Sequence, residues 1–301
     1  MSALLASLLQ GPTVPVPFTD FADWWARTAP LRARWPSTVE RAVALGFAAD
    51  RLGLAFAGGY TSAVLALDPG LPAEPGALCA TEDEGAHPRA IKARLEGGRL
   101  SGTKRFVSLG GWAKTLLVVA SEGRGDDGRN RLRVVRVAAG APGVRLEPMP
   151  ELPFVPEVPH ASVVLDGVAV APADLLPGDG YEAYLKPFRT IEDLHVHAAG
   201  AGYLLNVAAR AKWPPPVREA LLAAVATAQA LGAADARAPS THLALAGWLA
   251  AMQRVLSEAA PHWQAVDAAE RARFERDRPL LQVAGKAREA RRLKAWESLG
   301  G

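Results

Sequence analysis

The sequence changes its hydrophobic pattern twice, and this division most limits how the chain can fold. Between residues 78 and about 177, short apolar segments alternate with turns rich in glycine and proline, which is typical of a sandwich or barrel. On both sides of this zone, apolar residues recur every three or four positions, as in amphipathic helices. We therefore predict a multi-domain α+β chain: a short N-terminal helical region over 1–77, a central antiparallel β domain over 78–177 and a C-terminal helical bundle over 178–301.

The central zone divides into strand-like segments separated by turn residues. Residues 94–107 are typical of a strand, a turn at Gly97 and Gly98, and a second strand. The other predicted strands lie at residues 115–121, 132–138, 144–149 and 161–170.

Helices are predicted on both sides of this zone. Residues 20–27 and 38–54 have helical spacing, and Ser37 or Thr38 is placed to cap the second segment. Three consecutive prolines at 214–216 must end any helix that reaches them. The C-terminal bundle is expected to contain helical stretches at residues 181–211, 217–233, 241–259 and 268–296.

Composition narrows the class of protein. The formal net charge is only +3, and no nucleic-acid-binding motif accompanies the basic residues near the C-terminus, so we expect no nucleic-acid partner. The single cysteine, Cys79, excludes an internal disulfide and suits a reducing compartment. No strongly apolar segment is long enough to span a bilayer, so we expect a cytoplasmic protein without a membrane span.

Three segments occur in an order and spacing that resemble the acyl-CoA dehydrogenase family. The first, CATEDEGAHP at 79–88, resembles the family signature that opens the β domain. The second is GTKRFVSLGG at 102–111, and the third is VVLDGVAVAPADLLPGDGYEAYL at 163–185. The resemblance covers residues 78 to about 205, and it implies the family's fold of helices, β domain and helical bundle.

The resemblance implies that the chain binds FAD. A flat flavin ring needs a large side chain against one face and polar groups along its edge. By resemblance, Thr81 would contact the pyrimidine edge, Phe106 would pack on the ring and Ser108 would bond near N5. Cys79 and Ala80 would supply backbone contacts. Taken singly, Thr81 would cap a turn and Phe106 would be core; their paired spacing favours flavin contact.

The first segment also departs from the family pattern. Asp83 replaces a proline, His87 a serine and Pro88 an aspartate. Because the family's serine contacts the flavin and acyl-CoA side of the site, His87 is a candidate to contact substrate, to reshape the site or to donate a proton. A surface histidine on a diverged loop is an equally weighted alternative.

The usual catalytic base of the family is missing at its expected place. That glutamate lies in a turn before the last helix, and the matching position here is Ala284, which cannot accept a proton. Some members place the base on the first bundle helix, where this chain has Glu192 and Asp193. These two are the candidate bases; an acidic pair that favours a helix N-terminus is the alternative.

Two further patterns in the bundle carry no predicted site. Glu192 with His195, and Asp193 with His197, have spacings that share a helix face, but the two histidines diverge and no partner motif is present, so we expect no metal. The family's arginine that reaches a neighbour's flavin has no clear equivalent, and we do not transfer that role to Arg210.

The resemblance implies an FAD-dependent oxidoreductase that dehydrogenates the α,β bond of an acyl-CoA or similar thioester. Its expected partners are an acyl-CoA-like small molecule, an electron-transfer partner and further copies of the chain in a dimer or tetramer. Two alternatives stay open: a flavin-dependent monooxygenase on the same fold, and a catalytically inactive homologue that acts as a binding or assembly protein.

Overall fold

The computed structural model describes residues 3–10, 15 and 17–300. Its internal contacts group the chain into two compact units. The helical unit comprises Met1–Ala63, Pro153–Glu157 and Thr190–Gly301, and the sheet unit comprises Val64–Leu152 and Val158–Arg189. The three-part division made from the sequence remains a prediction about domains.

Two of the N-terminal helices begin at residues whose side chains cap them. Asp20 accepts a hydrogen bond from the Asp23 N–H, and the Ser37 hydroxyl accepts one from the Glu40 N–H, so the predicted cap at Ser37 is present. The predicted helix over 38–54 is wrong in extent, because the chain turns after Ala48 and a new helix begins at Leu52. The helices are α1 (Ala3–Leu9), α2 (Phe21–Arg27), α3 (Ala29–Arg34), α4 (Thr38–Ala48) and α5 (Leu52–Leu67).

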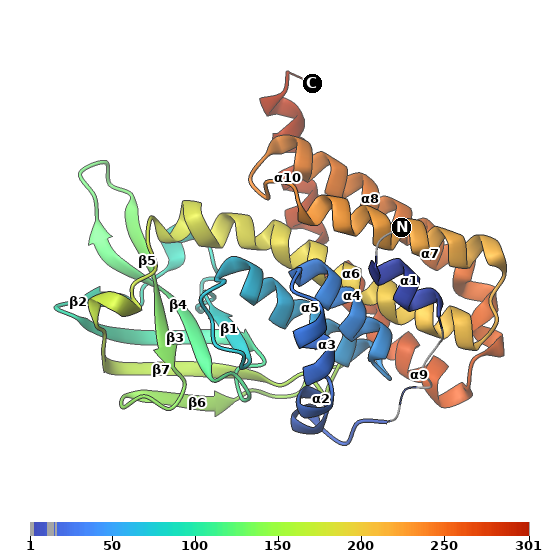
Figure 1. Cartoon of the computed structure of the whole chain (residues 1–301). Coiled ribbons are helices and arrows are strands. Elements are labelled where there is room, and N and C mark those ends of the chain that lie inside the picture. Colours follow the sequence, from blue (N-terminus) through green and yellow to red (C-terminus); the bar gives the residue numbers. More distant parts are fainter. Residues whose placement is uncertain (1–2, 11–14, 16, 301) are drawn as a thin grey trace. The chain divides into compact units, whose positions relative to one another are not determined.

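Within the described residues, seven strands form one sheet (Figure 1). They are β1 (Gly76–Cys79), β2 (Arg94–Glu96), β3 (Arg99–Ser108), β4 (Thr115–Arg124), β5 (Asn130–Ala138), β6 (Val144–Pro148) and β7 (His160–Ala169). The pairing order is β1–β4–β2–β3–β7–β6, and β5 pairs with β4. The sheet is mixed, because β1 and β2 run parallel to β4, whereas the prediction was wholly antiparallel.

Sequence pattern explains the centre of this sheet. The apolar run at the start of β4 is buried on both faces, as expected for a strand covered on both sides. The reversal between β2 and β3 occurs at Gly97 and Gly98, which have φ of 55° and 71°. Glycine adopts this left-handed conformation without steric cost, so the predicted turn forms where the glycines stand.

A π-helical segment, η3 (Gly180–Leu185), leads from the sheet unit into the long helix α6 (Lys186–Arg210). α6 ends before the three prolines, and the next helix starts with Pro215. The following elements are α7 (Pro215–Gly232), α8 (Pro239–Ala259), η4 (Ala260–Ala265), α9 (Ala268–Asp277), η5 (Arg278–Gln282) and α10 (Gly285–Ser298). The predicted continuous helix over 268–296 is wrong, because α9 ends at Asp277, the 3₁₀ segment η5 ends at Gln282, and Ala284, with φ of 67°, separates η5 from α10.

Small residues let α4 and α6 pack closely in the helical unit. A Cβ on Gly46 would lie 1.9 Å from the carbonyl oxygen of Ala199, and a Cβ on Gly202 would lie 2.2 Å from that of Val43. Neither position therefore accepts a larger residue. Further along the chain, α8 packs against both α7 and α10 (Figure 1).

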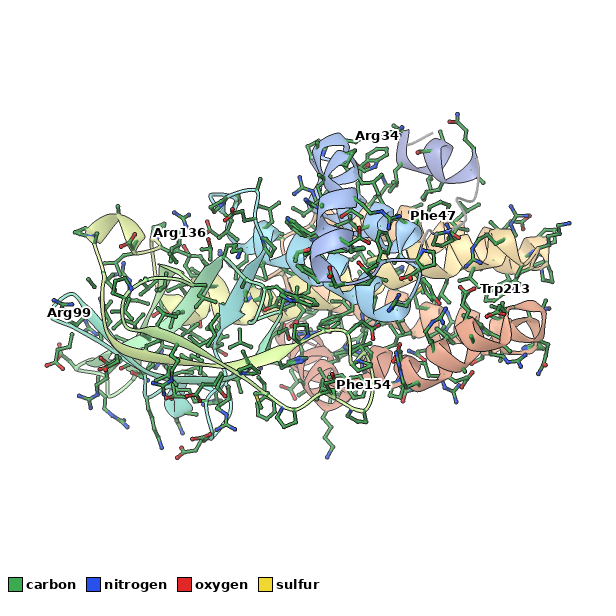
Figure 2. All side chains as sticks on the ribbon, turned by 90° about the horizontal axis from the view of Figure 1, so that it is seen from below. Arg34, Phe47, Arg99, Arg136, Phe154 and Trp213 are labelled. Atoms are coloured by element: carbon green, nitrogen blue, oxygen red, sulfur yellow. The ribbon has the colours of Figure 1, made fainter. Side chains whose placement is uncertain are left out.

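An aromatic cluster lies near the C-terminal end of α6. Trp213, labelled in Figure 2, lies edge-on to Trp263 with ring centroids 5.4 Å apart. Trp263 stacks on Phe274 at 4.0 Å, and Tyr203 contacts the same ring at 6.4 Å. These buried rings join α6, η4 and α9.

In the described part of the chain, no helix is both long enough and apolar enough to cross a membrane.

Candidate functional site

The loop that follows β1 is built around a buried carboxylate. Glu82 is 8% exposed, and one of its oxygens accepts hydrogen bonds from Lys104 Nζ at 2.6 Å and from the Ala93 N–H at 3.0 Å. Its other oxygen accepts from the Lys92 N–H at 2.8 Å. Lys104 is fully buried in β3 and also donates to the Ala80 carbonyl at 3.4 Å. These donors offset the cost of burying the charges and hold the loop in one conformation.

Burial shifts the pKa values of two side chains in this cluster, Lys104 and Cys79. Burial lowers the pKa of Lys104, and the Glu82 carboxylate opposes that shift. Burial raises the pKa of the Cys79 thiol to about 12, so Cys79 is not a nucleophile at neutral pH. The Ala80 carbonyl accepts a hydrogen bond from Lys104. The predicted flavin contacts of Cys79 and Ala80 remain predictions.

Phe106 combines backbone strain with exposure. Its φ is 54°, which is rare for a residue with a bulky side chain, and it lies at an irregularity in the pairing of β3 with β7. Its ring is 55% exposed. The adjacent Arg105 N–H donates to the Thr81 carbonyl at 2.8 Å, and the Phe106 N–H donates to Met149 Sδ at 3.3 Å. The structure therefore brings Thr81 next to the segment that presents Phe106.

Ser108 lies two residues further along β3 and faces a histidine of β7. The Ser108 Oγ is 3.2 Å from His160 Nε2, and His160 Nδ1 is 3.2 Å from the Val158 carbonyl oxygen. Burial lowers the pKa of His160, so the ring is neutral at pH 7. Phe106 and Ser108 alternate with the buried Val107 along the strand.

The residues present fit a flavin in the kinds of group they offer. An exposed aromatic ring held at a strained backbone position suits the face of a planar ring system. Thr81 lies in the loop after β1, and Ser108 lies in β3. Both residues are partly exposed, and their hydroxyl groups suit the polar edge of a ring. Phe106 and Ser108 thus belong to β3, and Thr81 belongs to the loop whose backbone accepts a hydrogen bond from the Arg105 N–H of that strand.

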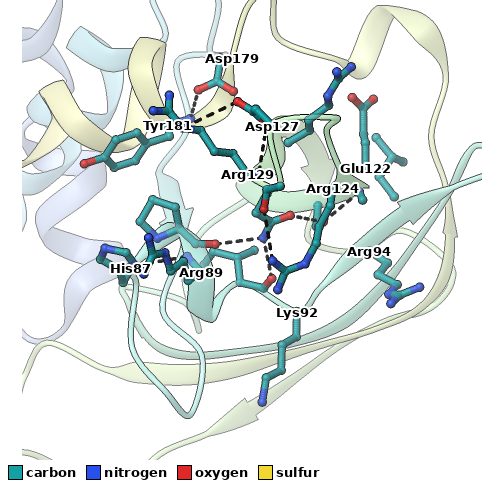
Figure 3. Close-up of a pocket in the computed structure, with 18 of the residues that line it drawn as sticks. His87, Arg89, Lys92, Arg94, Glu122, Arg124, Asp127, Arg129, Asp179 and Tyr181 are labelled. Atoms are coloured by element: carbon teal, nitrogen blue, oxygen red, sulfur yellow. Dashed lines mark hydrogen bonds and ion pairs between the residues drawn. The ribbon is translucent and has the colours of Figure 1, made fainter.

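His87 occupies a different part of the sheet unit. It is exposed and caps the short helix η1 (Pro88–Ala90), where its Nδ1 accepts from the Arg89 N–H at 3.2 Å. With η1, β2, the ends of β4 and β5 and the start of η3, it lines a pocket of about 1540 Å³ (Figure 3). This pocket carries charges of both signs, and its lining does not include Thr81, Phe106 or Ser108.

On α6, the two candidate bases have different surroundings. Asp193 is buried, and its carboxylate accepts from Arg288 Nε at 2.8 Å and from Arg291 through its other oxygen. Both arginines belong to α10, so Asp193 ties that helix to α6. Because both oxygens already accept guanidinium N–H groups, Asp193 is poorly placed to accept a proton from a substrate.

Glu192 carries the more suitable carboxylate of the two. Burial raises its pKa to about 7, the charge of Asp193 adds to the shift and Arg288 opposes it. Within the described residues, its carboxylate makes no hydrogen bond or ion pair. A carboxylate with this pKa exchanges protons readily at neutral pH, as a general base must.

The histidines near this pair are structural. His195 bonds the Ile191 carbonyl at 2.7 Å and the Thr38 hydroxyl at 2.9 Å, and burial lowers its pKa to about 4. His197 lies between the carbonyl oxygens of Asp193 and Leu281, and burial lowers its pKa too. Over the described residues, no three His, Cys, Asp or Glu side chains are grouped to hold a metal ion.

Ala284 and Arg210 lie elsewhere in the helical unit. Ala284 is exposed, lies in the turn directly before α10 and offers only a methyl group; its match to the family's glutamate position stays a prediction. Arg210 pairs with Glu270 through two hydrogen bonds, the shorter 2.6 Å, and donates to the Asn206 side chain at 2.7 Å. Its role within the helical unit is thus to link α6 with α9.

Sequence analysis missed three residues of the site: Glu82, Lys104 and His160. Lys104 stands at an inward position of β3, where a charged residue needs a partner, and Glu82 is the acid whose loop lies alongside. A lysine at an inward position of a strand was therefore the sequence signal that could have revealed this ion pair. Nothing local to the sequence pairs Ser108 with His160, which is 52 positions away.

Comparison with known proteins identifies the fold. A scan of protein-family models and a search of curated proteins both find no match. Butyryl-CoA dehydrogenase from Megasphaera elsdenii has a TM-score of 0.71 and 15% identity, with 100% of this chain and 99% of that chain covered. The prolyl acyl carrier protein oxidase AnaB has a TM-score of 0.67, 16% identity and coverage of 99% and 98%. FMN-bound TdsC from Paenibacillus sp. A11-2 has a TM-score of 0.64, 19% identity and coverage of 91% and 88%.

These likenesses establish the fold. The chain has the acyl-CoA dehydrogenase fold, as predicted from its sequence. The fold that the sequence resemblance implied is therefore confirmed, and the family roles of its individual residues stay predictions.

Proposed function

We propose that the chain is an FAD-dependent oxidoreductase that removes hydrogen from the α,β bond of an acyl-CoA or similar thioester. The observation that carries the proposal is Phe106: an exposed aromatic ring at a positive φ, joined through its neighbour Arg105 to the Thr81 carbonyl. Proteins keep such strain, about 1–3 kcal/mol, mainly where function uses it. The matched butyryl-CoA dehydrogenase and acyl carrier protein oxidase support a thioester substrate.

In this proposal the sheet unit binds the cofactor. Phe106 packs on the ring face, Thr81 donates to the pyrimidine edge, and Ser108 lies near N5. Cys79 and Ala80 add backbone contacts, and the Glu82–Lys104 pair keeps the loop in position. A bound flavin would supply the hydride acceptor. An FMN-bound structure is among those matched, so the choice of FAD over FMN is itself part of the test.

The helical unit supplies the proton acceptor. Glu192 takes the α-proton of the thioester, which its pKa of about 7 allows, while Asp193 anchors α10 and is not the base. His87 contacts a part of the substrate away from the reacting bond, because the polar pocket that it lines does not include Thr81, Phe106 or Ser108. The reaction needs an electron acceptor, for which we propose a protein partner, and we propose a homo-oligomer located in the cytoplasm.

A flavin-dependent monooxygenase is the second candidate. The turn before α10 carries Ala284 and Asp193 is held by two arginines, so the bundle has few groups able to remove an α-proton. Monooxygenation uses reduced flavin and oxygen and does not require that base. An inactive binding or assembly protein is the remaining alternative if the chain takes up no flavin.

The test is the visible spectrum of the full chain after incubation with FAD or FMN and desalting. Retained flavin absorbance that butyryl-CoA bleaches without oxygen supports the dehydrogenase. Retained flavin that no acyl-CoA bleaches supports the monooxygenase, and a colourless protein contradicts both.

Two variants and a matched control locate the cofactor. Phe106→Ala and Thr81→Val are expected to weaken flavin binding about tenfold each, from lost stacking and a lost hydrogen bond. Trp296→Ala removes another exposed aromatic ring, 47% exposed on α10, and should leave affinity unchanged. Equal affinity in all three variants would exclude the β3 site.

A further inference from the structure

We propose that His160 is a positioning residue that holds the Ser108 hydroxyl as a hydrogen-bond acceptor, so that the site prefers reduced over oxidised flavin. This inference rests on the proposed flavin site and goes beyond it. It concerns which redox state the chain selects, and it assigns a role to a residue outside the family signature segments.

The hydrogen-bond pattern determines the direction of the Ser108 hydroxyl. The Val158 carbonyl can only accept, so the His160 Nδ1, 3.2 Å away, must carry the hydrogen. A neutral imidazole has one N–H, which leaves Nε2 without hydrogen. Since Nε2 is 3.2 Å from Ser108 Oγ, the hydroxyl donates its hydrogen to the histidine. Toward any ligand, Ser108 then offers only lone pairs.

The strand pairing keeps this arrangement in place. Ser108 and His160 are direct partners in the antiparallel pairing of β3 with β7. Their neighbours in the register, Val107 and Ala161, are buried, so neither strand end is free to slide. The hydroxyl cannot turn outward without leaving Nε2 unpaired in a part-buried place, which costs free energy.

An acceptor-only hydroxyl discriminates between the two states of flavin. Oxidised isoalloxazine has a bare N5, which is also an acceptor, whereas the two-electron-reduced ring carries a hydrogen there. Two facing acceptors repel, while N–H and a hydroxyl oxygen form a hydrogen bond. With Ser108 near N5, the reduced ring is bound more tightly, and the reduction potential of bound flavin is raised relative to free flavin.

The experiment compares dissociation constants for oxidised and reduced FAD, measured without oxygen on the full chain. Wild type is expected to bind reduced FAD more tightly. His160→Leu removes the acceptor for the hydroxyl, and Ser108→Ala removes the hydroxyl. Each should lower the preference about five- to tenfold, the worth of one hydrogen bond. His160→Gln offers a carbonyl oxygen to the hydroxyl and should keep most of the preference.

Controls separate this inference from the proposed function. His242→Leu alters a histidine of the helical unit that bonds the Ala236 carbonyl, and it should leave the preference unchanged. If wild type binds neither form of FAD, the proposed function fails and this inference fails with it. If wild type binds flavin but Ser108→Ala keeps its preference, or His160→Gln loses as much as His160→Leu, only this inference is overturned. Ser108→Ala decides the matter even if a His160 variant does not fold.

Discussion

In the sheet unit, the buried carboxylate of Glu82 meets one lysine and two backbone N–H groups, whereas in the helical unit that of Asp193 lies between two arginines. Glu82 holds a loop, and the residue before it, Thr81, is partly exposed beside Phe106. Asp193 holds a helix, and the residue before it, Glu192, has a raised pKa and no paired group among the described residues.

The comparison shows how a buried ion pair can support a neighbouring residue without taking part in chemistry. In both units the oxygens of the paired carboxylate accept hydrogen bonds from nearby donors, which offset the cost of burying the charge. In both, we propose a functional role for the residue that precedes the paired carboxylate in the sequence. Of the adjacent acids Glu192 and Asp193, only Asp193 is paired, and on this difference we base the separate roles proposed for them.

The largest effect is expected for Glu192, the unpaired acid of the helical unit. Glu192→Gln should lower the rate of flavin reduction by acyl-CoA about 10²–10⁴-fold, the usual worth of a general base, while flavin stays bound. In wild type the rate should rise as pH increases through about 7, because the base acts only when ionised. Stopped-flow reduction between pH 5 and 9 measures both. A flat pH profile, or full activity in Glu192→Gln, removes Glu192 from the mechanism.

The next effect tests the ion pair of the sheet unit. Glu82→Leu leaves Lys104 buried without a counter-charge and two backbone N–H groups without an acceptor, so the free energy of unfolding should fall by about 3–5 kcal/mol. Lys104→Met should cost less, because the Glu82 carboxylate keeps its backbone donors. Urea unfolding measures both changes.

The control for this pair is Glu84→Gln. Glu84 pairs with Lys92 in an exposed bridge, which is worth about 0–1 kcal/mol. If Glu84→Gln and Glu82→Leu destabilise the protein equally, burial of the Glu82–Lys104 pair is not what holds the loop.

The smallest effect is expected for Asp193, the paired acid of the helical unit. Asp193→Asn keeps one acceptor oxygen but removes the charge between Arg288 and Arg291, so it should lower the free energy of unfolding by about 2 kcal/mol. Flavin bound to this variant should still be reduced by acyl-CoA. Normal stability together with lost reduction would reverse the roles assigned to Glu192 and Asp193.

The fold could be predicted from the sequence because the patterns that indicate it are local. Strand-like segments, glycine turns and the prolines at 214–216 each act over a few residues, and the structure has the corresponding elements near the predicted places. The errors also have local causes. The helix predicted over 38–54 is interrupted after Ala48, and that over 268–296 is interrupted at Ala284, where helical spacing continues in the sequence although the backbone turns. Periodicity alone does not report such breaks.

By itself, the sequence determined the class of fold and the candidate residues Thr81, Phe106 and Ser108, because turn chemistry, periodicity and motif spacing act over short separations. Only the tertiary structure decided that Asp193 is paired with α10 and Glu192 is not, and that His160 orients Ser108. These outcomes depend on contacts between residues 52 to 98 positions apart. Burial and hydrogen-bond partners determine proton affinity, and both exist only after distant segments have packed together.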